Sequence, residues 1–380
     1  MPVFTKIEEP KTELGRYRIL SSSAGVRVSP LVLGALSIGK SWSSTLGSMD
    51  KEASFRLLDA FTDAGGNFID TANNYQNEES EVFIGDWMAA RGNRDLLFLA
   101  TKFTNCYRTH ELGSGMTVNY GGNHKKSLYL SVEDSLRKLQ TNYIDLLYVH
   151  WWDWTTSIEE LMDSLHILVQ ERKVLYLGIS DTPAWVVSAA NVYAKDHGKT
   201  PFSVYQGRWN LMRRDFEREI IPMARHFGMA LCPWDVLGGG QLQSSKQLEE
   251  RQKSNEGGRN LRQSEDARKI SAALENVAIE HGASIQQIAL AYVLQKTRNV
   301  FPLIGGRKVE HLQDNIGALT ISLTENQIKN IECLKNFDIG FPLDFIGDDP
   351  KEVGSQPAVM EMLTGAKIAW QRAPRPIGHN

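Results

Sequence analysis

Short apolar runs alternate along this chain with longer stretches in which apolar residues recur at helical spacing. Phe55, Leu58 and Phe61 illustrate the second pattern, which predicts a helix with one apolar face. The apolar runs, bounded by polar and turn-forming residues, predict buried strands. Eight strands are expected, at residues 32–35, 68–71, 97–102, 146–150, 174–180, 203–207, 229–233 and 301–304. Six helices are expected between them, at residues 55–64, 131–139, 158–169, 183–194, 216–226 and 285–294.

Strands this apolar, separated by helices, predict a parallel sheet whose outer face is covered. Eight strand–helix units favour a (β/α)8 TIM barrel, with residues 1–380 forming one domain. A doubly wound open sheet is the alternative, but no glycine fingerprint follows the first strand. Residues 16–28, which precede the barrel, predict a small β-hairpin.

Capping residues indicate where two of the helices begin. Thr182 precedes Pro183, which predicts an N-cap followed by proline at the first helical position. Ser131 followed by Asp134 predicts a capping box in which Asp replaces the longer acid.

Three stretches interrupt the alternation. Residues 105–126 and 238–263 predict long loops after strands, and residues 336–380 predict a polar C-terminal tail broken by proline. In a TIM barrel, the loops that follow strands lie at the C-terminal face, where active sites form. We therefore expect both loops at the barrel mouth, with the tail over it.

Composition narrows the class of protein. The net charge is −3 and no basic block stands out, which argues against a nucleic-acid partner. Cys106, Cys232 and Cys333 are far apart, so they predict neither a disulfide framework nor a metal site and favour a reducing compartment. The N-terminus lacks the apolar segment of a signal peptide, and no apolar run is long enough to cross a membrane. We expect a cytoplasmic protein, monomeric or weakly self-associating, that acts on a small molecule.

Charged or polar residues stand at the ends of three consecutive predicted strands. Asp70, Lys102 and His150 are these residues, and Tyr75 follows the first of them in the loop. Three of the four have an ordinary explanation: Asp70 can cap a helix, His150 can be a structural histidine, and Tyr75 can serve in packing. A buried ammonium, however, needs a counter-charge. Because the three strands are neighbours in a barrel, the four side chains are expected to share one site.

The four residue types suit proton transfer to a carbonyl oxygen. A phenol with an unperturbed pKa near 10 is a poor acid or base at neutral pH. We expect the ammonium of Lys102 to lower the pKa of Tyr75, while Asp70 keeps Lys102 charged. His150 can donate a hydrogen bond to a carbonyl oxygen or relay a proton.

The chain resembles the aldo-keto reductases. The segment from Gly66 to Tyr75, with Ser80-Glu81 and Gly85 after it, is similar to the first signature of that family. Three further segments resemble the fungal aryl-alcohol dehydrogenases and norsolorinic-acid-reductase-like members; they are residues 150–154, 178–185 and 337–342. The resemblance implies the family tetrad on Asp70, Tyr75, Lys102 and His150, with Tyr75 as the general acid.

The resemblance also implies a bound nicotinamide dinucleotide and assigns residues to it. The carboxamide positions map to Ser180, Asp181 and Gln206, although many relatives have Asn in place of Asp181. The ring-stacking aromatic maps to Trp234. The pyrophosphate stretch maps to Val236, Leu237, Gly238, Gly239 and Gln241. The adenosine end maps to Gly305, Gly306, Arg307, His311, Asp314 and Asn315, although Gln is usual in place of His311. Arg307 and Lys308 favour NADP(H) over NAD(H), because they can pair with a 2′-phosphate.

Aromatic residues are dense in the predicted mouth loops, at positions 103, 107, 120, 151, 152 and 154. Flat apolar walls suit an aromatic substrate, and Tyr107, Trp151 and Trp152 are the expected contacts. At least two of the six are expected to pack beneath the loops instead. We therefore expect NADP(H)-dependent reduction of aromatic aldehydes, or reversible oxidation of aryl or benzylic alcohols. There are two alternatives. One is a reductase of a bulkier ketone in fungal secondary metabolism. The other is a non-catalytic NADP(H)-binding regulatory subunit, similar to the β subunits of potassium channels.

Overall fold

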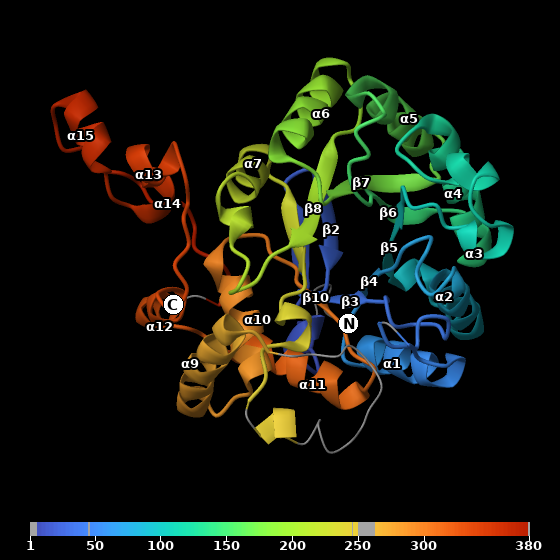
Figure 1. The fold of residues 1–380 in the computed structure, drawn as a ribbon, viewed down its shortest axis with the longest axis horizontal. Coiled ribbons are helices and arrows are strands. Elements are labelled where there is room, and N and C mark those ends of the chain that lie inside the picture. Colours follow the sequence, from blue (N-terminus) through green and yellow to red (C-terminus); the bar gives the residue numbers. More distant parts are fainter. Residues whose placement is uncertain (1–5, 45, 245, 250–262, 379–380) are drawn as a thin grey trace.

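Eight parallel strands form the centre of the molecule. The computed structural model describes residues 6–44, 46–244, 246–249 and 263–378 (Figure 1). The strand order in the sheet is β10-β3-β4-β5-β6-β7-β8-β9. The strands are β3 (Val32–Gly34), β4 (Phe68–Asp70), β5 (Phe98–Phe103), β6 (Ile144–Val149), β7 (Val174–Ser180), β8 (Phe202–Arg208), β9 (Ala230–Trp234) and β10 (Leu303–Ile304). All eight strands expected from the sequence are therefore confirmed.

The two edges of this sheet meet and close the barrel. Leu231 of β9 donates its backbone N–H to Asn299 O at 2.8 Å, and its carbonyl accepts the N–H of Phe301 at 2.8 Å. Residues 299–301 lead directly into β10, so these bonds join β9 to the strand at the other edge. The architecture is the expected (β/α)8 TIM barrel.

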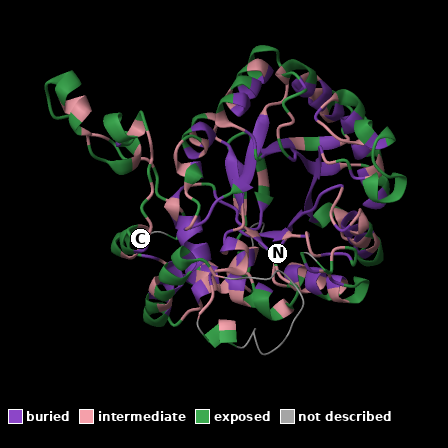
Figure 2. Cartoon of the chain, in the orientation of Figure 1, coloured by how far each residue is buried: buried purple, intermediate pink, exposed green. Residues whose placement is uncertain are grey.

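Helices surround the barrel, with buried faces inward and exposed faces outward (Figure 2). They are α1 (Lys51–Asp63), α2 (Glu79–Arg91), α4 (Lys125–Lys138), α5 (Ile158–Gln170), α6 (Ala184–Asp196), α7 (Ile220–Phe227), α9 (Glu265–His281), α10 (Ile285–Lys296), α11 (Val309–Gly317) and α12 (Glu325–Glu332). The six helices expected from periodicity are present, whereas α2, α9, α11 and α12 were not predicted. No helix within the described residues is both long and apolar enough to span a membrane.

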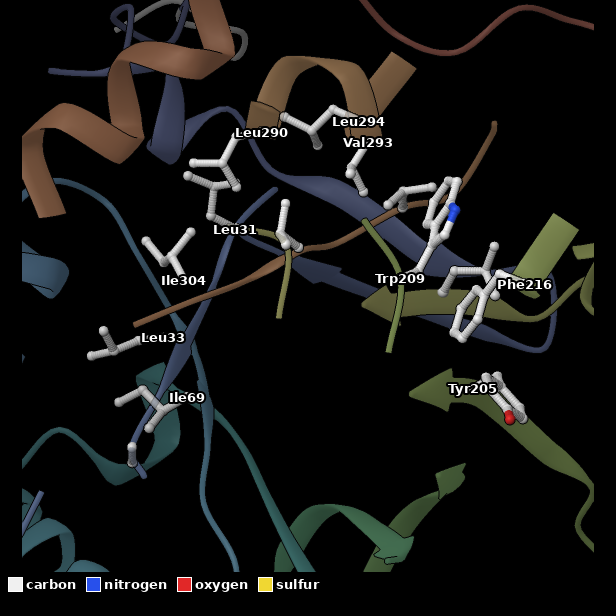
Figure 3. Packing of buried hydrophobic residues seen from close by; sticks show 14 of the residues in the cluster. Leu31, Leu33, Ile69, Tyr205, Trp209, Phe216, Leu290, Val293, Leu294 and Ile304 are labelled. Atoms are coloured by element: carbon white, nitrogen blue, oxygen red, sulfur yellow. The ribbon is translucent and has the colours of Figure 1, made fainter. Parts of the chain in front are cut away.

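A large apolar core lies between the sheet and the helices. Figure 3 shows Leu33 and Ile69 of the strands in the same cluster as Leu290, Val293 and Leu294 of α10. Every residue of α10 from Ile288 to Gln295 is buried, because α10 contacts the sheet and neighbouring helices together. Each fully buried Leu or Val contributes roughly 1.5–3 kcal/mol by leaving water.

The predicted hairpin covers the N-terminal end of the barrel. It consists of antiparallel strands β1 (Arg18–Ser21) and β2 (Ala24–Val28). Leu20 and Val28 pack in one cluster with Phe68 and Phe98, which are the first residues of β4 and β5. The hairpin therefore seals the N-terminal end of the barrel and leaves the C-terminal end for the site.

Both predicted helix starts are wrong. Helix α4 begins at Lys125, with the His124 side chain accepting the N–H of Ser127, so Ser131 lies inside the helix. Helix α6 begins at Ala184 with Pro183 as its N-cap residue, and the Thr182 hydroxyl donates instead to Ser180 O at 2.7 Å. In both cases a local pattern that resembles a cap lies one residue or more away from the true helix end.

The described part of the C-terminal tail, residues 336–378, does not cover the barrel mouth. Its described part includes α13 (Leu343–Ile346), α14 (Pro350–Val353) and α15 (Ala358–Thr364), which lie outside the ring of helices (Figure 1). Glu352 of α14 pairs with Arg298 at 2.7 Å and with Arg225 at 3.6 Å. These ion pairs hold the tail against the outer surface at α7 and α10, so the expectation that it lies over the mouth is wrong.

Candidate active site

Asp70 and Lys102 form an ion pair at the C-terminal end of the barrel. Asp70 is the last residue of β4, and Lys102 is the last but one of the adjacent strand β5. The Lys102 ammonium donates to Asp70 Oδ1 and, at 2.7 Å, to the carbonyl of Thr71. Both side chains are excluded from solvent. The expected counter-charge for the strand-end lysine is therefore confirmed.

A third residue, Gln206, also binds the Asp70 carboxylate. The side-chain amide of Gln206, on β8, donates to Asp70 Oδ2 at 2.9 Å. Burial raises the pKa of Asp70, while Lys102 and Gln206 oppose that shift by hydrogen bonding to the carboxylate. Burial also disfavours the ammonium, but the charge of Asp70 and the phenol of Tyr75 outweigh it and raise the pKa of Lys102. Lys102 therefore remains charged at neutral pH.

Tyr75 lies beside this ammonium. The Lys102 Nζ atom is 5.1 Å from the centre of the Tyr75 ring, so the ammonium and the phenol are close neighbours. The expectation that Lys102 brings the pKa of Tyr75 below its usual value is wrong in this structure. Burial raises that pKa by more than the lysine charge lowers it. The phenol therefore carries its proton at neutral pH, which suits a proton donor.

His150 faces Tyr75 from the next strand end. It follows β6, and its ring meets the tyrosine ring edge to face at 5.9 Å between centroids. Burial, together with the nearby charge of Lys102, lowers the pKa of His150 well below its usual value. The imidazole is neutral at physiological pH, which favours hydrogen-bond donation over the relay of a proton.

Two tryptophans extend the line of rings across the mouth. Trp42, in the loop after β3, contacts the Tyr75 ring edge to face at 6.3 Å. Trp151 lies 4.6 Å from the His150 ring and is 42% exposed. Trp151 was expected from the sequence, whereas Trp42 was missed. Its position in a loop that follows a strand was the available signal.

The other two expected substrate contacts are less exposed than Trp151. Tyr107 is buried, and its hydroxyl donates to Asp134 at 2.6 Å and to Leu130 O at 3.2 Å. It fastens the 105–126 loop to α4, so its assignment as a substrate contact is wrong. Trp152 is half-buried and packs against the barrel core. Phe103, the last residue of β5, is buried as well, so at least two of the six aromatic residues pack inside, as expected.

The residues assigned to the nicotinamide lie at neighbouring strand ends. Ser180 ends β7, and the N–H of Asp181 donates to Gln206 O at 3.1 Å. The indole N–H of Trp234, the last residue of β9, donates to Asp181 Oδ1 at 3.2 Å. Desolvation by the surrounding protein raises the pKa of Asp181 to about 6, although the residue keeps contact with solvent. The Gln206 amide nitrogen, by contrast, is already bound to Asp70.

The stretch assigned to the pyrophosphate follows β9. Gly238 and Gly239 have φ angles of 62° and 64°, a backbone region that favours glycine. Val236 is buried and Leu237 is half-buried, so their side chains anchor this turn. The Gln241 side chain accepts the N–H of Ser264 at 3.3 Å. Within the predicted 238–263 loop, residues 245 and 250–262 lie outside the described residues.

The residues assigned to the adenosine end lie after β10. Arg307, Lys308 and His311 are exposed, Gly305 is exposed beside half-buried Gly306, and Asn315 is buried in α11. The carboxylate of Asp314 accepts hydrogen bonds from Ser284 at 2.8 Å and from Gln287 at 3.0 Å. Asp314 therefore joins α11 to the start of α10. Cations and left-handed glycines are the kinds of group that suit a dinucleotide phosphate, and a flat aromatic face such as that of Trp234 suits stacking on a ring.

The comparisons with known proteins agree with this geometry. A sequence model of the Aldo/keto reductase family matches residues 30–336. A Saccharomyces cerevisiae protein named as an aryl-alcohol dehydrogenase is 64% identical over 353 residues, covering 92% of this chain and 94% of the relative.

Two other fungal relatives are similar over almost their full lengths. The aryl-alcohol dehydrogenase [NADP(+)] of Phanerodontia chrysosporium is 52% identical over 99% of this chain and 100% of the relative. Norsolorinic acid reductase B of Dothistroma septosporum is 49% identical over 95% of this chain and 93% of the relative. The barrel, the matched family model and these relatives together place the chain in the aldo/keto reductase family of oxidoreductases.

Proposed function

We propose that this protein catalyses the NADP(H)-dependent reduction of aromatic aldehydes and the reverse oxidation of benzylic alcohols. The observation that carries the proposal is the position of Tyr75. Its protonated phenol lies between the Lys102 ammonium and the neutral His150 ring, within a row of aromatic side chains. Such an arrangement suits proton donation to a carbonyl oxygen that is held against flat apolar walls.

The chain's own residues account for the proton. When bound, NADPH supplies the hydride. His150 orients the carbonyl oxygen by a hydrogen bond, and Tyr75 donates its proton to that oxygen as negative charge develops there. The Lys102 ammonium stabilises the phenolate that remains, and Asp70 keeps the ammonium in place. In alcohol oxidation the steps run in reverse: Tyr75 first releases its proton, and the phenolate, stabilised by Lys102, then accepts the proton of the alcohol.

Three groups of residues support the cofactor assignment. Trp234 offers a flat face for the nicotinamide ring, and Ser180 and Asp181 offer polar groups at its edge. The left-handed turn at Gly238 and Gly239 allows a phosphate to approach the backbone closely. Arg307 and Lys308 offer positive charge to a 2′-phosphate, which favours NADP(H) over NAD(H). The Phanerodontia chrysosporium relative, named for NADP(+), supports the same preference.

The test combines turnover with cofactor binding. Purified protein is expected to consume NADPH with veratraldehyde, and NADH much more slowly. Tyr75→Phe is expected to lose turnover while still binding NADPH, as measured by fluorescence titration. Tyr17→Phe is the matched control, because Tyr17 is exposed beside the hairpin at the other end of the barrel. Full activity in Tyr75→Phe would remove Tyr75 from its proposed role.

A bulkier aromatic ketone is the second candidate substrate. The similarity to norsolorinic acid reductase B, together with the exposed Trp151 at the mouth, favours it. A panel that runs from benzaldehydes to polycyclic aromatic ketones separates the two by their kcat/KM values. Absence of turnover with every carbonyl, despite tight NADPH binding, would favour a regulatory subunit instead.

A further inference from the structure

The loop that follows β5 holds His150 at its backbone. Thr104 has a φ angle of 114°, which is unusual for a β-branched residue. Its hydroxyl accepts the N–H of His150 at 3.3 Å, and that N–H also donates to Phe103 O at 3.1 Å. The Thr104 carbonyl accepts the N–H of Gly122 at 2.7 Å. The strained residue is therefore fixed from both sides, and it places Asn105 next to the histidine.

The side chain of Asn105 contacts the imidazole ring itself. Its amide nitrogen lies 3.0 Å from His150 Nδ1 and 3.2 Å from the side-chain oxygen of Asn74. While the Asn74 oxygen faces it, the reverse orientation of the Asn105 amide would place two carbonyl oxygens against each other. With the nitrogen toward both partners, each amide hydrogen has an acceptor.

With the amide nitrogen toward the ring, this contact indicates which ring nitrogen carries the proton. An amide nitrogen is only a donor, so His150 Nδ1 must be the unprotonated nitrogen that accepts. A neutral imidazole has one proton, which then resides on Nε2. Nε2 is the ring nitrogen that Asn105 does not contact, and as an N–H it can donate to a carbonyl oxygen.

We infer that Asn105 is a positioning residue that holds His150 in the Nε2–H tautomer, and that this tautomer orients the substrate carbonyl. The second half of this inference rests on the proposed function, whereas the first half does not. Asn105 acts through His150 and is assigned no contact with the substrate. The Asn74 side chain, from the loop that carries Tyr75, orients the Asn105 amide.

The substitution Asn105→Asp provides the sharpest test, because it keeps the size of the side chain and replaces a donor by an acceptor. The carboxylate will accept a proton from Nδ1, which stabilises either the Nδ1–H tautomer or the imidazolium. Nitrogen-15 NMR of histidine-labelled protein distinguishes these forms, and comparison with His150→Gln identifies the His150 signals. We expect the Nε2–H tautomer in the unsubstituted protein and its loss in Asn105→Asp. An Nδ1–H tautomer in the unsubstituted protein would overturn the inference without any measurement of turnover.

Kinetics test the second half. In single-turnover experiments with NADPH and veratraldehyde, Asn105→Asp is expected to slow hydride transfer by about 10²-fold, the usual effect of losing one donor to a developing oxyanion. The Kd for NADPH is expected to stay unchanged. Asn105→Leu removes the donor without adding a charge. Its rate of hydride transfer should lie between those of the unsubstituted protein and Asn105→Asp. Asn330→Asp on the exposed surface of α12 is the matched control and should behave as the unsubstituted protein.

The outcomes of these experiments distinguish the positioning role of Asn105 from the proposed enzymatic function. A changed tautomer with an unchanged transfer rate would overturn the positioning role while leaving Tyr75 chemistry intact. An unsubstituted enzyme that reduces no carbonyl would overturn the proposed function, and the NMR result would still decide the tautomer. If Asn105→Asp does not fold, the spectrum of the unsubstituted protein and the Asn105→Leu variant provide the same decision.

Discussion

Gln206 donates its side-chain amide to the one Asp70 oxygen that Lys102 does not use, at 2.9 Å. The two residues lie 136 positions apart in the chain, on strands β8 and β4. The Asp70 carboxylate therefore has a donor at each oxygen although it is shielded from water. Gln206 thus supports the charge that holds Lys102 in place.

Removing the amide donor should destabilise the protein. In Gln206→Leu the buried carboxylate of Asp70 loses a hydrogen bond that solvent cannot replace. We expect the free energy of unfolding to fall by about 1–3 kcal/mol, as measured by urea denaturation. Gln243→Leu, at a half-buried position whose contacts lie outside the tetrad, serves as control. Equal midpoints for the two variants would show that the contact contributes little.

Substitution of Lys102 by Met should produce a pH-dependent loss of stability. The buried Asp70 carboxylate is then unpaired, and breaking such a pair costs about 3–5 kcal/mol. Burial raises the pKa of Asp70 above its unfolded value, and Lys102→Met removes the cation that opposes that shift. The folded protein then binds more protons than the unfolded chain, so its stability falls as pH rises. The urea midpoint of Lys102→Met should therefore lie closer to that of the unsubstituted protein at pH 5 than at pH 8.

The double variant Asp70→Asn/Lys102→Met separates charge from packing. It has no buried charge at the tetrad, so it should recover much of the lost stability while remaining inactive. A stability loss in Lys102→Met that is the same at every pH would contradict this account.

Ionisation of Asp181 should alter the balance between the two cofactor forms. Its pKa is raised to about 6 by desolvation, so its carboxylate forms as pH rises from 5 to 7. On the proposed function this negative charge lies at the nicotinamide, and it favours the cationic ring of NADP⁺ over the neutral ring of NADPH. Because Asp181 is open to solvent, the effect is expected to be about fivefold in the ratio of the two Kd values. Asp181→Asn should make that ratio independent of pH in this range, as fluorescence titration of both forms would reveal.

The sequence predicted the barrel and the proximity of the strand-end residues because both depend on regular features. Apolar runs marked the strands, and Asp70, Lys102 and His150 end three runs that are neighbours in the barrel. The contacts around these residues were not predictable, because they join segments that are far apart in the chain. Asn105 reaches His150 from 45 positions away, and no local pattern connects them. The net direction of the Tyr75 pKa shift also depends on burial, which the residue types alone do not give.

Other expectations failed because the residue types in a segment do not determine where its side chains point, where a helix begins or which course the chain takes. Tyr107 belongs to a loop rich in aromatic residues, yet its side chain turns toward α4 and bonds with Asp134. Ser131 and Asp134 have the spacing of a capping box but lie within a longer helix. The course of the polar tail depends on contacts such as those of Glu352 with Arg225 and Arg298, and no local pattern in the tail predicts these partners.

Trp42 is expected to discriminate in favour of aromatic substrates. Its edge-to-face contact with Tyr75 places an indole beside the proton donor. In Trp42→Ala the loss of an aromatic contact, worth about 0.5–1.5 kcal/mol, should lower kcat/KM for veratraldehyde by about 2- to 10-fold. The value for a short aliphatic aldehyde should change less. Trp185→Ala, at an exposed position on α6, provides the comparison. An equal loss for both aldehydes would mean that Trp42 supports the site without selecting its substrate.

The ion pairs of Glu352 predict a local role for the tail. In Glu352→Gln the carboxylate between Arg225 and Arg298 is lost, and the two guanidinium groups then repel each other. We expect the tail to detach more often, at a cost of about 0.5–1 kcal/mol, and limited proteolysis to cleave after α12 faster. Glu361→Gln is the matched control, because Glu361 pairs with Lys367 inside the tail. The unfolding midpoint of the barrel and the turnover of veratraldehyde should stay unchanged, since the tail lies on the outer helices. Loss of turnover in Glu352→Gln with an intact barrel would instead indicate that the tail reaches the mouth during catalysis.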